Sequence, residues 1–232
     1  MNLIKAFWQF SRPHTIFGSI FSVSTLYIIA CEGKHLTNYW PLFLLTLFAS
    51  LACNIFIVGL NQIIDIEVDK INKPYLPLAS GVFSLLTGKI IVYISLALTL
   101  VLAFATSWFL GVLISIIVLI GIAYSVPPIQ LKKHHLPAAL CITLVRGLLV
   151  NIGMLIHFRY VMFNNDITSK LPNYIWPLTI FMIAFSIAIA WFKDLPDTEG
   201  DEQYQFKTLA ILYSKKTAFI AGSIMVIVAY IY

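Results

Sequence analysis

Long apolar stretches recur along this chain of 232 residues, and they constrain its fold more than any other feature. A membrane-spanning helix needs about 20 mostly apolar residues, and within lipid its backbone polar groups must pair inside the segment. Composition agrees, because only 11% of the residues are charged, against about a quarter in soluble domains. We therefore expect an all-α, polytopic transmembrane bundle of about seven helices, at roughly Thr15–Ala30, Trp40–Ile64, Gly88–Ser107, Trp108–Val126, Leu136–Ile156, Trp176–Phe192 and Thr217–Tyr232.

The basic residues predict the orientation of these helices. Lys34, Arg159 and Lys170 lie in segments on one side of the predicted membrane, and Arg146 lies inside a predicted span. The remaining Lys and Arg residues lie on the other side, together with all acidic residues except Glu32 and Asp166. Because Lys and Arg are enriched in cytoplasmic loops, we expect this charged face, with the N-terminus, on the cytoplasmic or equivalent side.

Two acidic clusters lie on the charged face, each at the end of an apolar run. Asn61, Asp65 and Asp69 are spaced four residues apart, so a helix would carry all three on one face. The second cluster contains Asp194, Asp197 and Asp201. Proteins bind Mg²⁺ through carboxylates together with substrate phosphates. We expect the clusters to meet across a membrane-embedded cavity and hold Mg²⁺ and a phosphorylated substrate, although a solvated helix end or an acidic loop would explain either cluster alone.

Cationic side chains beside such a site would stabilise a diphosphate leaving group. Arg146 is the strongest candidate, because an unpaired guanidinium inside a span is costly; a structural ion pair is the alternative. Asn151, five residues further on, could face the same cavity. The other candidate substrate-binding residues are Arg12, Lys73, Lys132, Lys133 and Lys193. The loop lysines could instead serve only to orient the chain.

Several classes of function lack their sequence signatures. The chain has no Gly-rich phosphate loop, His-Glu-x-x-His motif or nucleophile elbow. The adjacent pair His134-His135 has no Cys or His cluster beside it, so a zinc site is not expected, and no basic aromatic surface for nucleic acid is evident. Two rival classes stay open. One is a transporter, which should place its acidic residues near mid-membrane, and the other is a non-catalytic membrane subunit.

Taken together, the motifs resemble those of the UbiA superfamily of intramembrane prenyltransferases. Asn61-x-x-x-Asp65-x-x-x-Asp69 is similar to the family's first Asp-rich motif, and Asp197-x-x-x-Asp201 is similar to the second. The resemblance runs from about residue 8 to residue 210. The homogentisate prenyltransferase branch is resembled in Ser11-Arg12-Pro13-His14-Thr15, Asn61-Gln62, Asn72-Lys73-Pro74, Tyr124-Ser125-Val126-Pro127-Pro128, Arg146-Gly147 and Lys193-Asp194-Leu195-Pro196-Asp197.

The resemblance implies transfer of a prenyl group, such as phytyl or solanesyl, from its diphosphate to homogentisate, with loss of diphosphate and CO2, in tocopherol or plastoquinone biosynthesis. A chlorophyll synthase-like or other UbiA-type prenyltransferase is the near alternative. The metal ligands implied for Mg²⁺ are Asn61, Asp65, Asp69, Asp194, Asp197 and Asp201. Asp65, Asp69, Asp197 and Asp201 are the catalytic residues that the resemblance implies. Arg146, which its charge inside a span singles out, is added to them because it would help neutralise the leaving diphosphate.

The resemblance also implies an architecture and a location. Helices should surround a central cavity that opens laterally to membrane lipid. Family members usually have nine spans, so we expect a single domain over residues 1–232 that lacks the usual last two helices, either as a fragment or as a short form. The membrane would be bacterial, cyanobacterial or plastid, with the active site on the cytoplasmic or stromal side.

Overall fold

The computed structural model describes residues 2–32, 36–163 and 171–231, and the regular structure of this part of the chain is helical. The all-α prediction is therefore confirmed. Six segments are long and apolar enough to cross a membrane: α2 (Pro13–Ala30), η1 with α3 (Leu36–Ile64), α5 (Leu85–Thr106), α6 (Trp108–Ser125), α7 with η3 and α8 (His135–Met162), and α9 (Ile175–Phe192). The parts of the composite segments are η1 (Leu36–Tyr39), α3 (Trp40–Ile64), α7 (His135–Ile142), the π-helix η3 (Thr143–Gly153) and α8 (Met154–Met162).

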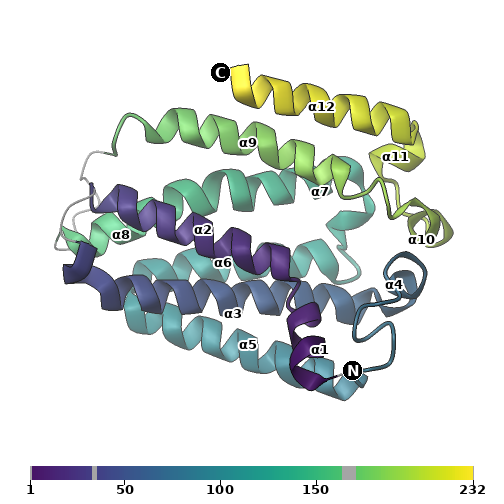
Figure 1. Cartoon of the computed structure of the whole chain (residues 1–232), viewed down its shortest axis with the longest axis horizontal. Helices are drawn as coiled ribbons and strands as arrows, with labels where there is room; N and C mark the ends of the chain where they lie inside the picture. Colours follow the sequence, from purple (N-terminus) through teal and green to yellow (C-terminus); the bar gives the residue numbers. More distant parts are fainter. Residues whose placement is uncertain (1, 33–35, 164–170, 232) are drawn as a thin grey trace.

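The seventh predicted segment forms α12 (Lys215–Ile231), which has 17 residues. At about 1.5 Å per residue it is shorter than the roughly 30 Å of a bilayer's hydrocarbon core. It packs along the outer side of α9 (Figure 1). The prediction of about seven helices is thus consistent with six spanning segments and this shorter helix. Four residues used in the predictions, Lys34, Asp166, Lys170 and Tyr232, lie outside the described ranges.

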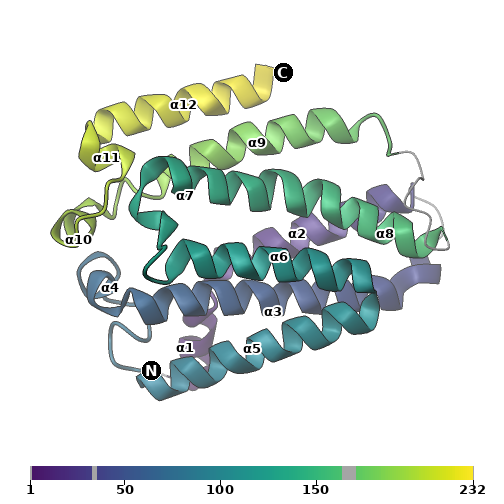
Figure 2. The same cartoon turned by 180° about the vertical axis from the view of Figure 1, so that it is seen from behind.

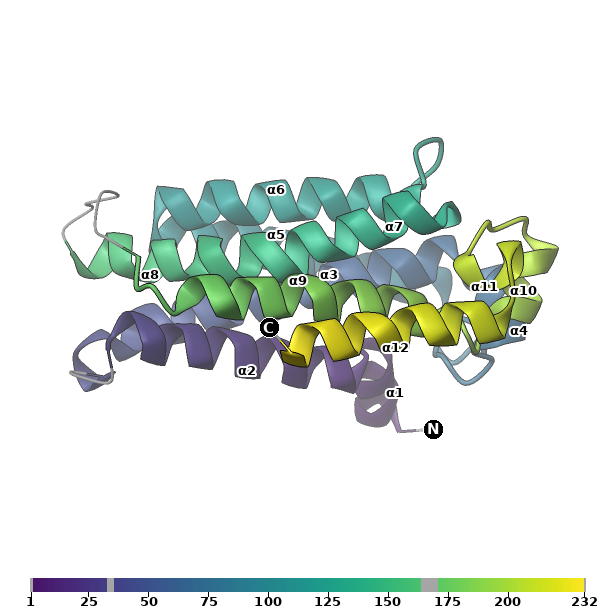
Figure 3. The ribbon, with the colours of Figure 1, turned by 90° about the horizontal axis from the view of Figure 1, so that it is seen from above.

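The long helices run side by side, and the short ones gather at one end of the bundle. Figures 1 and 2 show α4 (Ile66–Asn72), α10 (Thr198–Gln203) and α11 (Leu209–Leu212) together at that end. The central helix is α3, which packs against α2, α5 and α6, whereas α9 packs against α7, η3 and α12. Seen from above, α9 lies between α7 and α12 (Figure 3). The two acidic clusters therefore follow helices with different neighbours: α3 packs among α2, α5 and α6, and α9 packs among α7, η3 and α12.

Glycines allow the closest approaches between helices, as is usual in membrane bundles. A Cβ on Gly59 of α3 would lie 2.8 Å from the side chains of both Phe10 and Val92. A Cβ on Gly147 of the π-helix would lie 3.1 Å from the Cα atom of Ile183 on α9. Side chains at these two positions would push α1 and α5 away from α3, and α9 away from the π-helix.

The N-terminal helix α1 (Leu3–Phe10) was not predicted from the sequence. It crosses the ends of the long helices beside α3 (Figure 1). Its buried face carries Ala6 and Phe10, while Ile4 and Trp8 are exposed on the other face. The buried Gln62 of α3 donates a hydrogen bond of 2.7 Å to the carbonyl of Phe10. A helix with one exposed apolar face is typical of segments lying in a membrane interface.

Candidate active site

The first acidic cluster lies where α3 gives way to α4. The sequence predicts one helix face, but α3 ends at Ile64, Asp65 leaves helical geometry with φ −101° and ψ 17°, and α4 begins at Ile66. The hydrogen-bond register nevertheless continues through the break. The Asp65 amide donates to the Asn61 carbonyl at 3.0 Å, and the Asp69 amide donates to the Asp65 carbonyl at 2.7 Å. The chain bends at Asp65 while all three polar residues stay at the same end of the bundle.

The second acidic cluster is built differently. Helix α9 ends at Phe192, a turn carries Asp194 and Asp197, and α10 carries Asp201. Asp194 and Asp201 are buried, and Asp197 is partly buried. The Asp201 amide donates to the Asp197 carbonyl at 3.1 Å, which begins α10.

The two acidic clusters are joined by Asn72 and Lys73, which follow the first cluster in the sequence. Asn72 donates to Oδ1 of Asp201 at 3.2 Å and accepts from the Gly200 amide at 2.8 Å. Lys73 forms an ion pair with Asp197. Helices α4 and α10 consequently lie against each other at one end of the bundle (Figures 1 and 2). We call this assembly of the two clusters and their lysine partners the acidic mouth.

Two further lysines pair with carboxylates of the acidic mouth. Nζ of the buried Lys132, in η2 (Leu131–Lys133), lies 2.5 Å from both carboxylate oxygens of Asp65. Burial lowers the pKa of Lys132, and the adjacent Asp65 carboxylate opposes that shift. Nζ of Lys193 lies 2.7 Å from Oδ1 of its neighbour Asp194. Lysine charges thus neutralise several of the carboxylates that the sequence predicts as metal ligands.

The remaining carboxylates carry the largest electrostatic cost. Oδ2 of Asp69 is buried and has no hydrogen-bond partner among the described residues. Burial raises the pKa of Asp69 to about 6, although Lys73 and Arg12 act in the opposite direction. Burial, followed by the nearby charges of Asp197 and Asp194, raises the pKa of Asp201 to about 7. A cation bound here would relieve the cost of ionising both groups.

The donor set of the acidic mouth fits Mg²⁺. Among the residues that the structure describes, no three His, Cys, Asp or Glu side chains are grouped closely enough to form a metal site by themselves. Mg²⁺ does not need such a cage, because it usually keeps several waters and binds one or two carboxylates plus substrate phosphates. The unpaired oxygen of Asp69 and the raised pKa of Asp201 are therefore what a site completed by metal and phosphate would show.

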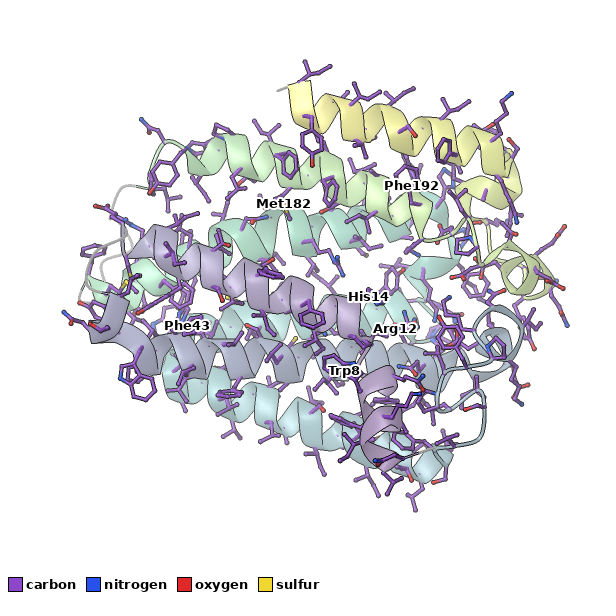
Figure 4. All side chains as sticks on the ribbon, in the orientation of Figure 1. Trp8, Arg12, His14, Phe43, Met182 and Phe192 are labelled. Atoms are coloured by element: carbon purple, nitrogen blue, oxygen red, sulfur yellow. The ribbon has the colours of Figure 1, made fainter. Side chains whose placement is uncertain are left out.

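A cavity of about 430 Å³ extends into the bundle. Its walls come from α2, α3, α6, the α7–η3–α8 segment and α9, so the predicted central cavity is confirmed. Most of the lining is apolar. Figure 4 marks Met182 of α9, which lines the cavity, and also His14 and Arg12 at the start of α2. The polar side chains of the lining are Thr15, Ser19, Ser22, Ser50, Asn54, Tyr124, Arg146 and Ser186.

The other predicted binding residues occupy different places. Arg12 lies between α1 and α2 with φ 52°, a strained conformation for a residue other than glycine. Its positive charge lowers the pKa of Asp69 and so opposes the effect of burial. Arg146 lines the cavity. Asn151 is buried, and its amide donates to the carbonyls of Arg146 at 2.8 Å and Gly147 at 3.1 Å, so it supports the π-helix. Nζ of Lys133 lies 5.6 Å from the ring centroid of Phe206.

Comparison with known proteins identifies the family. The model of the UbiA prenyltransferase family matches residues 21–232. The chain belongs to this family. It is 44% identical to the homogentisate phytyltransferase of Synechocystis sp., a match that covers 94% of this chain and 71% of that protein.

Plant relatives and solved structures of the UbiA family agree. The chain is 37% identical to homogentisate phytyltransferase 1, chloroplastic, of Arabidopsis thaliana, covering 93% of this chain and 56% of that protein. It is also 37% identical to that plant's homogentisate solanesyltransferase, chloroplastic, over a match that covers 98% of this chain and 59% of that protein. The chain thus spans just over half of these two relatives.

A UbiA homolog from Archaeoglobus fulgidus, solved with GPP and Mg²⁺, has the same fold, with a TM-score of 0.67 and 15% identity over 97% of this chain and 75% of that one. A structure of digeranylgeranylglyceryl phosphate synthase superposes with a TM-score of 0.68 and 24% identity, covering 100% of this chain and 76% of that one. These likenesses confirm the UbiA fold that the motifs predict.

Three residues of this UbiA-family site were not predicted as site residues. Asn72 joins the two clusters, Ser125 accepts a hydrogen bond of 3.4 Å from the amide of Asn61, and the Tyr124 ring centroid lies 5.9 Å from Nζ of Lys193. The stretches Asn72-Lys73-Pro74 and Tyr124-Ser125-Val126-Pro127-Pro128 did belong to the resemblance. Asn72, Ser125 and Tyr124 carry no charge, so the spacing of charged residues could not indicate a role for them. Only the match to the family motifs could have identified them.

Proposed function

We propose that this protein transfers a prenyl group, such as phytyl or solanesyl, from its diphosphate to the ring of homogentisate. The observation that carries the proposal is the acidic mouth, where Asn72 and Lys73 join the two acidic clusters beside an apolar cavity. The identities of 44% and 37% to proteins named as homogentisate phytyltransferase and solanesyltransferase support this donor and acceptor. The products would be precursors of tocopherol or plastoquinone.

The acidic mouth would bind the diphosphate of the donor. Asp65, Asp69, Asp197 and Asp201, with Asn61 and Asp194, would hold Mg²⁺, which supplies Lewis-acid stabilisation of the leaving diphosphate. The lysines already lie at these carboxylates, and their ammonium groups can turn to the incoming phosphate oxygens. Those lysines are Lys73, Lys132 and Lys193. Lys133 and Arg12 would add positive charge from the flanking segments.

The proposed transfer replaces the bond between prenyl C1 and the diphosphate with a bond between C1 and the acceptor ring. The bond between prenyl C1 and the diphosphate oxygen breaks, and its electron pair leaves with the diphosphate. A π electron pair of the acceptor ring forms the new bond to C1, and loss of the ring proton restores aromaticity. The carboxylate leaves as CO2, and the methylene carbon takes up one proton with the electron pair left behind. The apolar cavity wall would exclude water that could otherwise intercept the allylic carbon.

Location and domain organisation are part of the proposal. The described helices would form one prenyltransferase domain embedded in the membrane, with the prenyl chain among apolar side chains of the cavity. The excess of basic residues on the face of the acidic mouth supports a cytoplasmic or stromal active site. A transporter is less well supported, because the six predicted metal ligands lie at the end of the bundle and a transport site would lie near mid-membrane.

The test uses protein purified in detergent with Mg²⁺ and homogentisate, with phytyl or solanesyl diphosphate in separate reactions. Mass spectrometry of the lipid extract should detect a decarboxylated, prenylated quinol, and one donor should react faster than the other. EDTA should abolish the product, and Asp65→Ala should reduce turnover by about 100-fold or more, by analogy with removal of one preorganised electrostatic group. Undiminished turnover in Asp65→Ala would contradict the proposed site.

A further inference from the structure

Arg146 is a cation in the membrane-spanning part of the protein. It belongs to the segment His135–Met162, and its side chain is exposed to the cavity. Within residues 2–32, 36–163 and 171–231, no carboxylate forms an ion pair with it; the basic members of the ion pairs there are Lys70, Lys73, Lys132, Lys193 and Arg159. A guanidinium at membrane depth is costly unless an anion or another polar partner meets it. The cavity therefore has a positive charge without a countercharge on its wall.

The diphosphate of the donor is an unsuitable partner for this charge. None of the carboxylates of the acidic mouth lines the cavity, and neither do Lys73, Lys132 or Lys193. The acidic mouth also has its own cations for the diphosphate. Arg146 instead lines the cavity together with Tyr124, Asn54 and apolar residues such as Met182. The guanidinium therefore lies on the wall of the mostly apolar cavity. Tyr124, whose ring centroid is 5.9 Å from Nζ of Lys193, is where this wall meets the acidic mouth.

The backbone around Arg146 is shaped to hold this position. Arg146 belongs to an 11-residue π-helix, a form that is rare and frequent at functional sites. The Asn151 amide donates to the carbonyls of Arg146 and Gly147, so a side chain stabilises the wide turn. On the other side, the missing side chain of Gly147 lets the backbone of Ile183 approach. The backbone at Arg146 is thus supported by two hydrogen bonds from Asn151 and by the packing of Gly147 against α9.

We propose that Arg146 binds the carboxylate of an aromatic acid inside the cavity and so selects acidic over neutral acceptors. This inference rests on the proposed function and specifies its acceptor subsite. A guanidinium forms two parallel hydrogen bonds with a carboxylate, which would fix the orientation of the ring as well as its position. The polar groups of Asn54 and Tyr124 on the same wall would meet the ring hydroxyls. Asn151 acts as a positioning residue for Arg146.

Binding measurements without turnover test the proposal. Calorimetry on the purified protein, without donor, compares homogentisate with methylhydroquinone, which has the same ring hydroxyls and no carboxylate. A prenyl thiodiphosphate with Mg²⁺ reports the donor site separately. Arg146→Gln should weaken homogentisate binding about 10- to 100-fold, the range for a charged hydrogen-bonded pair, and leave methylhydroquinone and thiodiphosphate within about threefold. The affinity of Arg146→Lys for homogentisate should lie between those of the unaltered protein and Arg146→Gln. Asn151→Ala should weaken the binding of homogentisate but not of the other two ligands. Lys216→Gln, at an exposed position, is the control and should change none of the three affinities.

Other outcomes separate the inference from the proposed function. If Arg146→Gln weakens the thiodiphosphate and leaves homogentisate unchanged, Arg146 serves the diphosphate and the inference is wrong, while the transferase proposal stands. If the unaltered protein binds both quinols equally, the carboxylate is not recognised and the inference is also wrong. If homogentisate binding depends on Arg146 but no prenylated product forms, the carboxylate site stands and the transferase proposal fails. Should Arg146→Gln not fold, as judged by size-exclusion chromatography, Arg146→Lys decides.

Discussion

The two acidic clusters have similar spacing but different supports. The first begins within α3 at Asn61 and is interrupted only by Asp65, the single non-helical residue between α3 and α4. The lysine partner of Asp65, Lys132, is buried and 67 residues away in the sequence. The second follows α9 through a turn, and the partner of Asp194 is its immediate neighbour Lys193. The first cluster is therefore held by the tertiary structure, and the second is held by local pairs and by its contacts with the first.

The difference follows from where the two parent helices lie. Helix α3 is at the centre of the bundle, with Phe56 and Gln62 buried, so its end is fixed by packing on several sides. Helix α9 lies between α7 and α12 (Figure 3) and also packs against the π-helix, but among the described residues it lacks the extensive packing with α2, α5 and α6 that surrounds α3. The comparison suggests that the first cluster is a preorganised half of the site and that the second depends on Asn72 and Lys73 for its position. Four predictions test this view.

The largest effect is expected from Asp69, which is buried in the preorganised half. Asp69→Ala should lower kcat/KM for prenyl transfer by about 100-fold or more, because a preorganised electrostatic group is lost. Glu67, on the same short helix, is exposed and, among the residues that the structure describes, forms its ion pair with Lys70. Glu67→Ala is the matched control and should stay within about threefold. Equal losses in the two variants would show that the integrity of α4, rather than a ligand role of Asp69, is being measured.

The two lysine–carboxylate pairs should differ in their contribution to stability. Lys132→Met leaves the largely buried Asp65 carboxylate without its partner and should cost about 2 kcal/mol or more of unfolding free energy without metal. Lys193→Met also leaves a buried carboxylate, Asp194, unpaired. The side chain of Lys193 is 37% exposed, however, so solvent weakens this pair and Lys193→Met should cost less than Lys132→Met. Thermal unfolding in detergent with EDTA measures both. A larger loss from Lys193→Met would reverse the proposed roles of the two clusters.

Asn72 should matter for the position of the second cluster. Asn72→Leu removes two hydrogen bonds to α10, each worth about 1 kcal/mol, and should weaken Mg²⁺-dependent thiodiphosphate binding about tenfold. The free energy of unfolding should fall by about 2 kcal/mol or less, which is the contribution of those two bonds, because Asn72 lies outside the bundle core. Glu202→Ala, at an exposed position on α10, is the control. Unchanged affinity in Asn72→Leu would mean that the second cluster keeps its position without the first.

The smallest effect is a dependence on pH. The pKa of Asp69 is raised to about 6 and that of Asp201 to about 7, so protons compete with Mg²⁺ below these values. Thiodiphosphate binding at limiting Mg²⁺ should therefore be about twofold weaker at pH 7 than at pH 8, and Asp201→Asn should remove that step. The stability of the metal-free protein should depend on pH in the opposite direction from ligand binding. Both folded-state pKa values exceed the unfolded ones, so this contribution to stability is present at low pH and is lost as pH rises through 6 to 7.

Much of the site could be predicted from spacing alone. Polar residues four apart predicted the place of Asn61, Asp65 and Asp69, and hydrogen bonds through the break at Asp65 keep that register. The choice between Lys132 and Lys133 could not be predicted, because adjacent lysines look alike in sequence. The structure places the first against Asp65 and the second near Phe206. The π-helix was also missed, because its residues have the same apolar pattern as an α-helix.

The membrane bundle follows from the amino-acid sequence, since apolar length requires helices in lipid, and both acidic clusters are located by their spacing and family motifs. Which groups meet became known from the packing of the helices. Asn72 reaches Asp201 across 129 residues of sequence, and Lys73 reaches Asp197 across 124. It also placed Arg146 on the wall of a cavity that none of the carboxylates of the acidic mouth lines. The physical reason is that helix formation depends on neighbouring residues, whereas charge pairing and cavity lining depend on how distant helices pack.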